Sequence, residues 1–195
     1  MQKVNNFKII AGKFKGKVLN MPTFDSTRSS KAILRESYFN KLQFEIVDMP
    51  LVEMFAGSGS IGLEALSRGA SDVYFIEKNR DAFKILEQNI RTLGVGENTH
   101  SYLGNIFDVI EDVKRVLKSK NQKAYFYADP PFSIREAEEE IYIKTFEMLS
   151  SLPSEIVEMI TIEHMSGLEL PEKIADFTLS KTKKFGKSSL SYYII

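Results

Sequence analysis

The chain has 195 residues, 43% of them hydrophobic, with 26 basic and 26 acidic residues. This length and composition are typical of one domain with one sizeable core. The absence of cysteine excludes disulfides, thiolate-bound metal centres and any reaction that needs a thiol nucleophile. No apolar run approaches the ~18 residues of a membrane span, and the N-terminus lacks the apolar core of a signal peptide. We therefore expect a cytoplasmic protein that does not enter a membrane.

Basic residues are concentrated in the first part of the chain. Residues 1–35 hold eight basic residues and one acidic residue, so they carry +7 and the remaining 160 residues carry −7. Residues 7–19 are predicted to form a β-hairpin that turns at Gly12-Lys13, with lysines at alternate positions of its second arm. A basic segment with a strand pattern favours contact with a polyanion, although an ordinary solvated tail is the alternative. The candidate RNA-binding residues are Lys8, Lys13, Lys15, Lys17 and Arg28.

Residues 30–43 follow a helical pattern. We expect an apolar stripe of Ala32, Ile33, Phe39 and Leu42, with Arg35 and Glu36 elsewhere on the helix surface. The hairpin and this helix make up a basic N-terminal extension over residues 1–45. Residues 46–195 are predicted to form the catalytic core of the same single domain, 1–195.

From residue 51 onward, short apolar strands alternate with helices. Strands are predicted at 51–55, 72–77, 100–103, 124–129 and 158–164, and helices at 60–68, 80–93, 106–118 and 134–150. Such alternation indicates parallel βαβ units with helices on both faces of a sheet. Residues 174–184 and 188–195 look like two arms of an antiparallel hairpin around Gly186-Lys187. The predicted fold is therefore α/β and Rossmann-like, with a seven-stranded, mostly parallel sheet that ends in an antiparallel pair.

A glycine-rich turn follows the first strand of this core. The stretch from Glu53 to Gly62 contains G-x-G-x-x-G, and glycines at such a turn let the backbone approach a ligand closely. Glu77 ends the next strand, where a carboxylate can hold the two hydroxyls of a ribose. This spacing suits NAD as well as S-adenosyl-L-methionine, so the turn alone leaves the cofactor open.

The tetrapeptide Asp129-Pro130-Pro131-Phe132 favours methyl transfer to an amino nitrogen. Two prolines hold the chain extended and remove two backbone donors. The Asp129 carboxylate and the Pro130 carbonyl could then accept both hydrogens of an exocyclic base amine, which directs its lone pair at a methyl donor. Phe132 can stack on the base. The alternative is a structural strand–helix junction that contains a buried phenylalanine. An amino nitrogen needs no covalent help, which agrees with the absence of cysteine.

A third loop, from Gly104 to Phe107, follows the third core strand. Asn105 could accept a hydrogen bond from an adenine amine, and the Ile106 backbone N–H could donate to a ring nitrogen. The alternative role for Asn105 is a helix N-cap, and both roles can hold together. No metal site is predicted.

Several stretches together resemble the RsmD-type bacterial small-subunit ribosomal RNA guanine-N2 methyltransferases. They are FAGSGSIGLEALSRGA, IEKN, DPPF, STRSSKAILRESYFN, IIAGKFKGKVL and KKFGKSSLSYY, which span nearly the whole chain. This chain departs from the family pattern at Thr27-Arg28-Ser29-Ser30, where the family usually has TRPT, and at Glu53, where it usually has Asp.

The resemblance implies S-adenosyl-L-methionine as cofactor and methylation of one guanine N2 in 16S rRNA, within an assembling small ribosomal subunit. It implies a cofactor site built from Glu53, Phe55, Ala56, Gly57, Ser58, Gly59, Glu77, Lys78, Asn105, Ile106 and Arg35, and a guanine site from Asp129, Pro130, Pro131 and Phe132. We expect a monomer.

Three other functions stay open from the residues themselves. A methyltransferase of the same fold could act on adenine N6 of DNA or RNA, because the tetrapeptide reads an amino group and not a whole base. An NAD-dependent oxidoreductase would explain the glycines and Glu77 but would leave the tetrapeptide unused. A non-enzymatic RNA-binding module would not need the acid of Asp129.

Overall fold

The computed structural model describes residues 5–22, 28–131 and 137–195. The strands are β1 Asn5–Lys8, β2 Val18–Met21, β3 Leu51–Met54, β4 Val73–Glu77, β5 Thr99–Leu103, β6 Ala124–Ala128, β7 Val157–Met165, β8 Lys173–Ile174, β9 Phe177–Phe185 and β10 Ser188–Ile194. The α-helices are α1 Arg28–Leu42, α2 Ser60–Ser67, α3 Arg80–Leu93, α4 Ile106–Ser119 and α5 Ala137–Ser150, and short 3-10 turns lie at Gly96–Asn98 and Ser154–Ile156.

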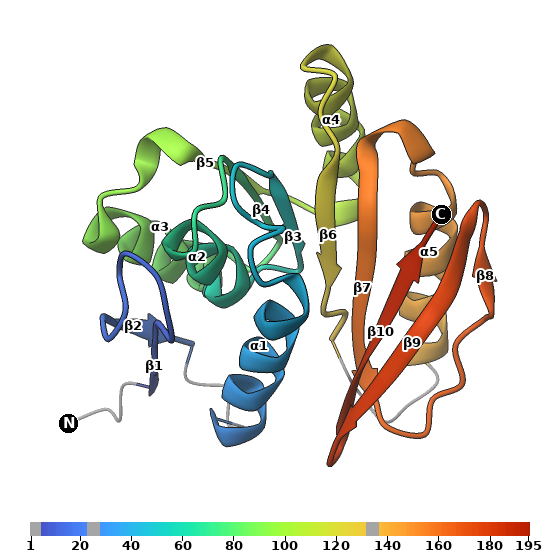
Figure 1. The fold of residues 1–195 in the computed structure, drawn as a ribbon, viewed down its shortest axis with the longest axis horizontal. Helices are drawn as coiled ribbons and strands as arrows, with labels where there is room; N and C mark the ends of the chain where they lie inside the picture. Colours follow the sequence, from blue (N-terminus) through green and yellow to red (C-terminus); the bar gives the residue numbers. More distant parts are fainter. Residues whose placement is uncertain (1–4, 23–27, 132–136) are drawn as a thin grey trace.

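Within the described residues, eight strands form one sheet in the order β5-β4-β3-β6-β7-β10-β9-β8 (Figure 1). The strands from β5 to β7 are parallel, and β10 pairs antiparallel with both β7 and β9. This is the predicted sheet with its C-terminal antiparallel pair, and the two-residue strand β8 is added at the edge. The Rossmann-like α/β prediction is confirmed.

The sheet carries a hydrophobic core on each face. On one face, α1, α2 and α3 pack on residues such as Phe75, Tyr127 and Tyr192. On the other face, α4 and α5 cover residues such as Phe126 and Ile160. Both faces are therefore buried, which is why β3, β4 and β6 are apolar almost throughout rather than alternating.

The helix α1 presents a different face from the predicted one. The side chains of Leu34, Phe39 and Leu42 are buried, whereas Ile33 is 55% exposed and Ala32 is exposed. Arg35, predicted to lie on the surface, is only 4% exposed, because it packs against α2 instead of facing water. The predicted apolar stripe was thus wrong in its first half and right in its second.

The N-terminal hairpin is shorter than predicted. β1 and β2 pair from Asn5↔Met21 to Lys8↔Val18, and residues 9–17 form turns between them. Gly12 has φ +81°, and a Cβ there would lie 1.7 Å from the Ser67 carbonyl oxygen. The loop is held on the end of α2 by this close approach, so its lysines do not alternate along a strand, and that prediction was wrong.

Among the described residues, none of the helices is both long and apolar enough to cross a membrane. Ser133 and Glu136 have the sequence pattern of a helix capping box, and they lie outside the described residues. Asn79, which precedes α3, is its N-cap, because its side chain accepts hydrogen bonds from the N–H groups of Asp81 and Ala82.

Candidate functional site

The glycine-rich turn lies at the carboxyl end of β3, between that strand and α2. Its backbone is unusual at three positions: Phe55 has φ 61°, Gly57 has φ 55° and Gly59 has φ 78°. A phenylalanine in the left-handed region is strained, and such strain concentrates at ligand sites. The turn is fixed to the neighbouring strand, because the Ala56 N–H donates to the Ile76 carbonyl at 2.9 Å.

Glu53, in β3, holds this turn through hydrogen bonds to the start of α2. Its two carboxylate oxygens accept hydrogen bonds from the N–H groups of Ile61 (3.1 Å) and Gly62 (2.8 Å), and the residue is 4% exposed. Burial raises the pKa of Glu53 to about 8, although these two donors act in the opposite direction. The side chain therefore binds the start of α2 and fixes the turn that precedes it.

Glu77 faces the same turn from the end of β4. Its Oε2 accepts the Gly57 N–H at 2.7 Å and its Oε1 accepts the Asn79 N–H at 2.6 Å. Each carboxylate oxygen has a second lone pair, so both can still accept a hydroxyl group. The predicted ribose carboxylate and the predicted glycine turn are thus in direct contact. Lys78 follows on the exposed surface.

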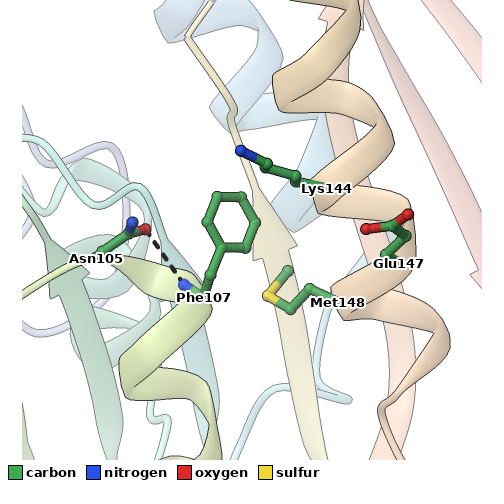
Figure 2. A pocket seen from close by; sticks show the side chains of 5 residues that line it. All are labelled: Asn105, Phe107, Lys144, Glu147 and Met148. Carbon is green, nitrogen blue, oxygen red and sulfur yellow. Dashed lines mark hydrogen bonds between the residues drawn. The ribbon is translucent and has the colours of Figure 1, made fainter.

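The third predicted loop lies beside Glu77. The Gly104 N–H donates to the Glu77 carbonyl at 3.0 Å, and Asn105 caps α4 by accepting the Phe107 N–H at 3.3 Å. An open hollow of about 410 Å³ is lined by Asn105 and Phe107 on one side and by Lys144, Glu147 and Met148 of α5 on the other. Figure 2 shows these five side chains. A volume of this order is typical of small-ligand sites. The N-cap role of Asn105 is confirmed, and its role toward adenine stays a prediction.

Asp129 follows β6 directly. β3 and β6 are parallel neighbours with Met54 opposite Ala128, so the glycine turn and Asp129 leave the sheet side by side. The Asp129 side chain is 24% exposed, and its Oδ2 lies 3.4 Å from the Nζ of Lys31 in α1. Pro130 is buried and Pro131 is exposed, whereas Phe132 lies outside the described residues. The predicted amine-binding acceptors and the predicted cofactor turn therefore share one edge of the sheet.

A buried polar pair lies beneath Asp129. The Tyr127 hydroxyl donates to the Oε2 of Glu163 in β7 at 2.8 Å, and its ring meets Tyr38 of α1 edge-on at 4.9 Å. Burial, with the negative charges of Glu163 and Asp129, raises the pKa of Tyr127 well above its usual range. Tyr127 therefore stays protonated and donates, which fixes the end of β6.

Arg35 lies in a buried network rather than against the glycine turn. Its Nε is 3.6 Å from the Oε2 of Glu64, and its Nη2 donates to the Lys8 carbonyl at 2.8 Å. Burial lowers the pKa of Arg35, while Glu64 acts to raise it. Glu64, fully buried, also accepts the backbone N–H groups of Ile10 and Ala11. The network joins α1, α2 and the N-terminal loop.

The predicted RNA-binding lysines lie together on the N-terminal hairpin, where Lys8 is paired with Val18, the neighbour of Lys17. Lys13, Lys15 and Lys17 are exposed in the loop that meets the far end of α2, where the Lys13 N–H donates to the Ser67 carbonyl at 2.7 Å. Lys8 is exposed on β1. Arg28 begins α1, but its side chain lies outside the described part of the chain.

Two residues of this region were missed from the sequence. Asn89 in α3 is 1% exposed, and its Nδ2 donates to the carbonyls of Ser58 and Asn20, which ties the glycine turn to β2. Lys31 contacts Asp129 across 98 positions of the chain. A polar residue on the apolar side of α3 was an available signal for Asn89, whereas Lys31 was counted only as part of a basic segment.

An open α/β sheet with a glycine turn and a carboxylate at the ends of adjacent strands defines a nucleotide-cofactor fold. The antiparallel strand β10 between β7 and β9 is typical of the class I methyltransferase type. A comparison with known structures agrees. An S-adenosylmethionine-dependent methyltransferase from Agrobacterium tumefaciens superposes with a TM-score of 0.68 at 10% identity, which covers 100% of this chain and 71% of that one and shows the fold alone.

The sequence comparisons identify the family. Residues 7–194 match the family model described as Conserved hypothetical protein 95, and the chain belongs to this family. The ribosomal RNA small subunit methyltransferase D of Escherichia coli K12 is 32% identical over 187 residues, which are 95% of this chain and 88% of that protein. The solved structure of the Escherichia coli protein yhhF superposes with a TM-score of 0.75 at 29% identity, over 97% and 98% of the two chains. The predicted resemblance is confirmed.

Proposed function

We propose that this chain transfers a methyl group from S-adenosyl-L-methionine to the exocyclic N2 amine of a specific guanine in small-subunit 16S rRNA. One observation carries the proposal: the acceptors of Asp129 and Pro130 lie beside the glycine turn at the end of the neighbouring strand. The name of the Escherichia coli relative supports ribosomal RNA as the substrate. The choice of guanine rests on the family resemblance.

The residues at the carboxyl ends of β3, β4 and β5 fit S-adenosyl-L-methionine. Glu77 accepts the Gly57 N–H of the glycine turn with one carboxylate oxygen and the Asn79 N–H with the other, and both oxygens can still accept the hydroxyls of a ribose. Glu53 and Asn89 hold that turn, and Asn105 borders the neighbouring hollow, where the adenine would lie. When bound, the cofactor supplies a methyl group on a positively charged sulfur, an electrophile that needs no activation by a thiol.

The residues around Asp129 hold the amine. The carboxylate accepts one amine hydrogen and the Pro130 carbonyl accepts the other, so the nitrogen lone pair points toward the glycine turn. Transfer would exchange the methyl group's bond to sulfur for a bond to this nitrogen and would leave S-adenosylhomocysteine as the product. Positive charge would then develop on the nitrogen, where the adjacent carboxylate stabilises it. The excess proton leaves through Asp129 to water. Positioning and electrostatics account for catalysis.

Residues 8–17 contain four exposed lysines and no acidic residue. This concentration of positive charge supports a large polyanion as the substrate. We propose that the protein works as a cytoplasmic monomer on RNA in an assembling small subunit.

The test is methylation of small-subunit RNA by the purified protein with isotope-labelled S-adenosyl-L-methionine, followed by mass spectrometry of the nucleosides. We expect labelled N2-methylguanosine at one position. Labelled N6-methyladenosine would establish the adenine alternative instead. Binding of RNA without any methyl transfer would favour a non-enzymatic RNA-binding module. Tight binding of NAD, measured by calorimetry, would indicate NAD as the cofactor instead of S-adenosyl-L-methionine.

A further inference from the structure

The β9–β10 hairpin reaches the edge of the sheet at which Asp129 lies. β7 runs parallel to β6 with Ile162 opposite Ala128, and it continues three residues further, to Met165. Met165 is paired with Ser188, the first residue of β10. At ~3.3 Å per residue, the hairpin turn therefore projects ~10 Å past the end of β6. Figure 1 shows this turn at the lower end of the molecule, toward which β6 and β7 run.

This hairpin is basic and contains no acidic residue that would balance the charge of its lysines. Residues 177–195 contain four lysines and no acidic residue: Lys181, Lys183, Lys184 and Lys187. None of the four forms a salt bridge within the described part of the chain. By contrast, Lys118, Lys123 and Lys144 all meet a glutamate within 4 Å. Uncompensated lysines of one sign create a positive potential over this edge.

Lys183 lies on the same face of the sheet as the acceptor site, whereas Lys184, paired with Ser189, points to the other face and Lys187 lies in the turn. Lys183 is paired with Leu190, whose side chain lies in the same core as Tyr127, two residues before Asp129. Directly opposite residues of an antiparallel pair point to the same face. Beside the turn, Met165 and Leu168 are 43% and 40% exposed, and the Ser166 N–H donates to the Lys187 carbonyl at 2.9 Å. Apolar side chains here are interleaved with positive charge.

We infer that the tip of the β9–β10 hairpin, formed by Lys183, Lys184, Lys187 and the adjoining turn at Met165–Leu168, binds the RNA backbone next to the methylated base. The inference rests on the proposed function. The phosphates that flank a base held by Asp129 must pass over this edge of the sheet, and the lysines bind them there. Met165 and Leu168 contact the sugars and bases between those phosphates. The N-terminal loop, on the far end of α2, contacts a more distant part of the same RNA.

The test compares two triple variants with equal loss of charge. In the first, Lys183, Lys184 and Lys187 are replaced by Gln. In the control, Lys118, Lys123 and Lys173 are replaced by Gln. Asp129 follows the end of β6, whereas these three lysines lie near the end of α4, before the start of β6 and beside the start of β9, at the opposite edge of the sheet. Binding of the substrate RNA is measured at several salt concentrations, together with steady-state methylation and calorimetric binding of S-adenosylhomocysteine.

We expect the slope of log affinity against log salt to fall by roughly 2 in the hairpin variant, since each phosphate contact on single-stranded RNA contributes ~0.7. The KM for RNA should rise at least ~10-fold, while kcat at saturating RNA and cofactor affinity stay near those of the wild type. The control should match the wild type throughout.

A hairpin variant with the salt slope and KM of the control would overturn the inference. If the wild-type protein itself methylates no RNA, the proposed function fails, and this result is distinguishable because it does not depend on the variants. Loss of S-adenosylhomocysteine binding in the hairpin variant would also contradict the inference, because it would reveal a general effect on the fold.

Discussion

The two halves of the sheet edge differ in how their polar groups are used. In the cofactor half, Glu53, Glu77 and Asn89 direct their side chains at backbone groups of the glycine turn or of α2. In the acceptor half, Asp129 is a quarter exposed and meets the flexible side chain of Lys31 at 3.4 Å. The first half is organised before any ligand arrives, whereas the second presents acceptors toward solvent.

This difference has a physical reason. A cofactor of constant shape is bound best by a rigid site, because little ordering is needed on binding. An acceptor site must admit a base that leaves its stack, and so its groups stay accessible. Substitutions in the two halves should therefore separate cofactor binding from methyl transfer.

The largest effect is expected at Asp129. Replacing Asp129 by Ala should lower the rate of methyl transfer by ~10³-fold, because the charge that develops on the amine loses its partner. S-adenosylhomocysteine affinity, measured by calorimetry, should not change. Full methylation by this variant would show that Asp129 has no role in methyl transfer. A parallel loss of cofactor affinity would show that the two halves of the sheet edge do not act separately in cofactor binding and methyl transfer.

The next effect concerns Arg35, which the family resemblance assigns to the cofactor and the structure places beside Glu64. Arg35→Met should lower the free energy of unfolding by ~2–3 kcal/mol, since it removes one of the two guanidinium partners of Glu64, the other being Arg68, and the hydrogen bond to the Lys8 carbonyl. Denaturant titration measures the loss, and Arg80→Met, at an exposed position of α3, is the matched control. Unchanged stability with weakened cofactor binding would instead support the cofactor role.

A smaller effect is expected at Glu77. Glu77→Gln should weaken S-adenosylhomocysteine binding by ~1.5–3 kcal/mol, or roughly 10- to 100-fold, the usual contribution of hydrogen bonds to a charged group. RNA binding should be unaffected. The exposed Glu97→Gln serves as control. If cofactor affinity stays at the wild-type value, the ribose is held elsewhere.

The smallest effect is expected for the N-terminal loop. Reversing Lys13, Lys15 and Lys17 to Glu should reduce the salt dependence of RNA binding and weaken affinity less than the hairpin variant does. The reason is distance: α2 has eight residues, so this loop lies ~12 Å from the glycine turn. Binding isotherms at several salt concentrations test it. An unchanged slope would leave the loop a purely structural element.

Local patterns were sufficient for most of the elements. The helix predicted over 80–93 is α3 with the same bounds, capped by Asn79, and the helix predicted from 106 begins there after Asn105. Apolar periodicity and N-caps act over a few residues, so they can be read from the sequence. The same holds for the strand–turn–helix context of Gly57 and for the position of Asp129 at a strand end.

The errors share a cause in long-range contacts. The loop over residues 9–17 pairs with Ser67 and Glu64, more than fifty positions away, instead of continuing the hairpin. Arg35 is buried because the same Glu64 is available to it. Neither partner could be inferred from neighbouring residues, since α2 and the N-terminal segment are distant in the chain and meet only in the tertiary structure.

By itself, the sequence determined the α/β class, the glycine turn and the positions of the Glu77 and Asp129 carboxylates at strand ends, because each depends on spacing within one βα unit. Only the tertiary structure decided which of these meet. Parallel pairing of β3 with β6 brings the turn beside Asp129, packing of α1 brings Lys31 to the same carboxylate, and antiparallel pairing of β10 with β7 carries a lysine-rich turn to this edge. Strand order joins residues far apart in the chain, and no local pattern encodes it.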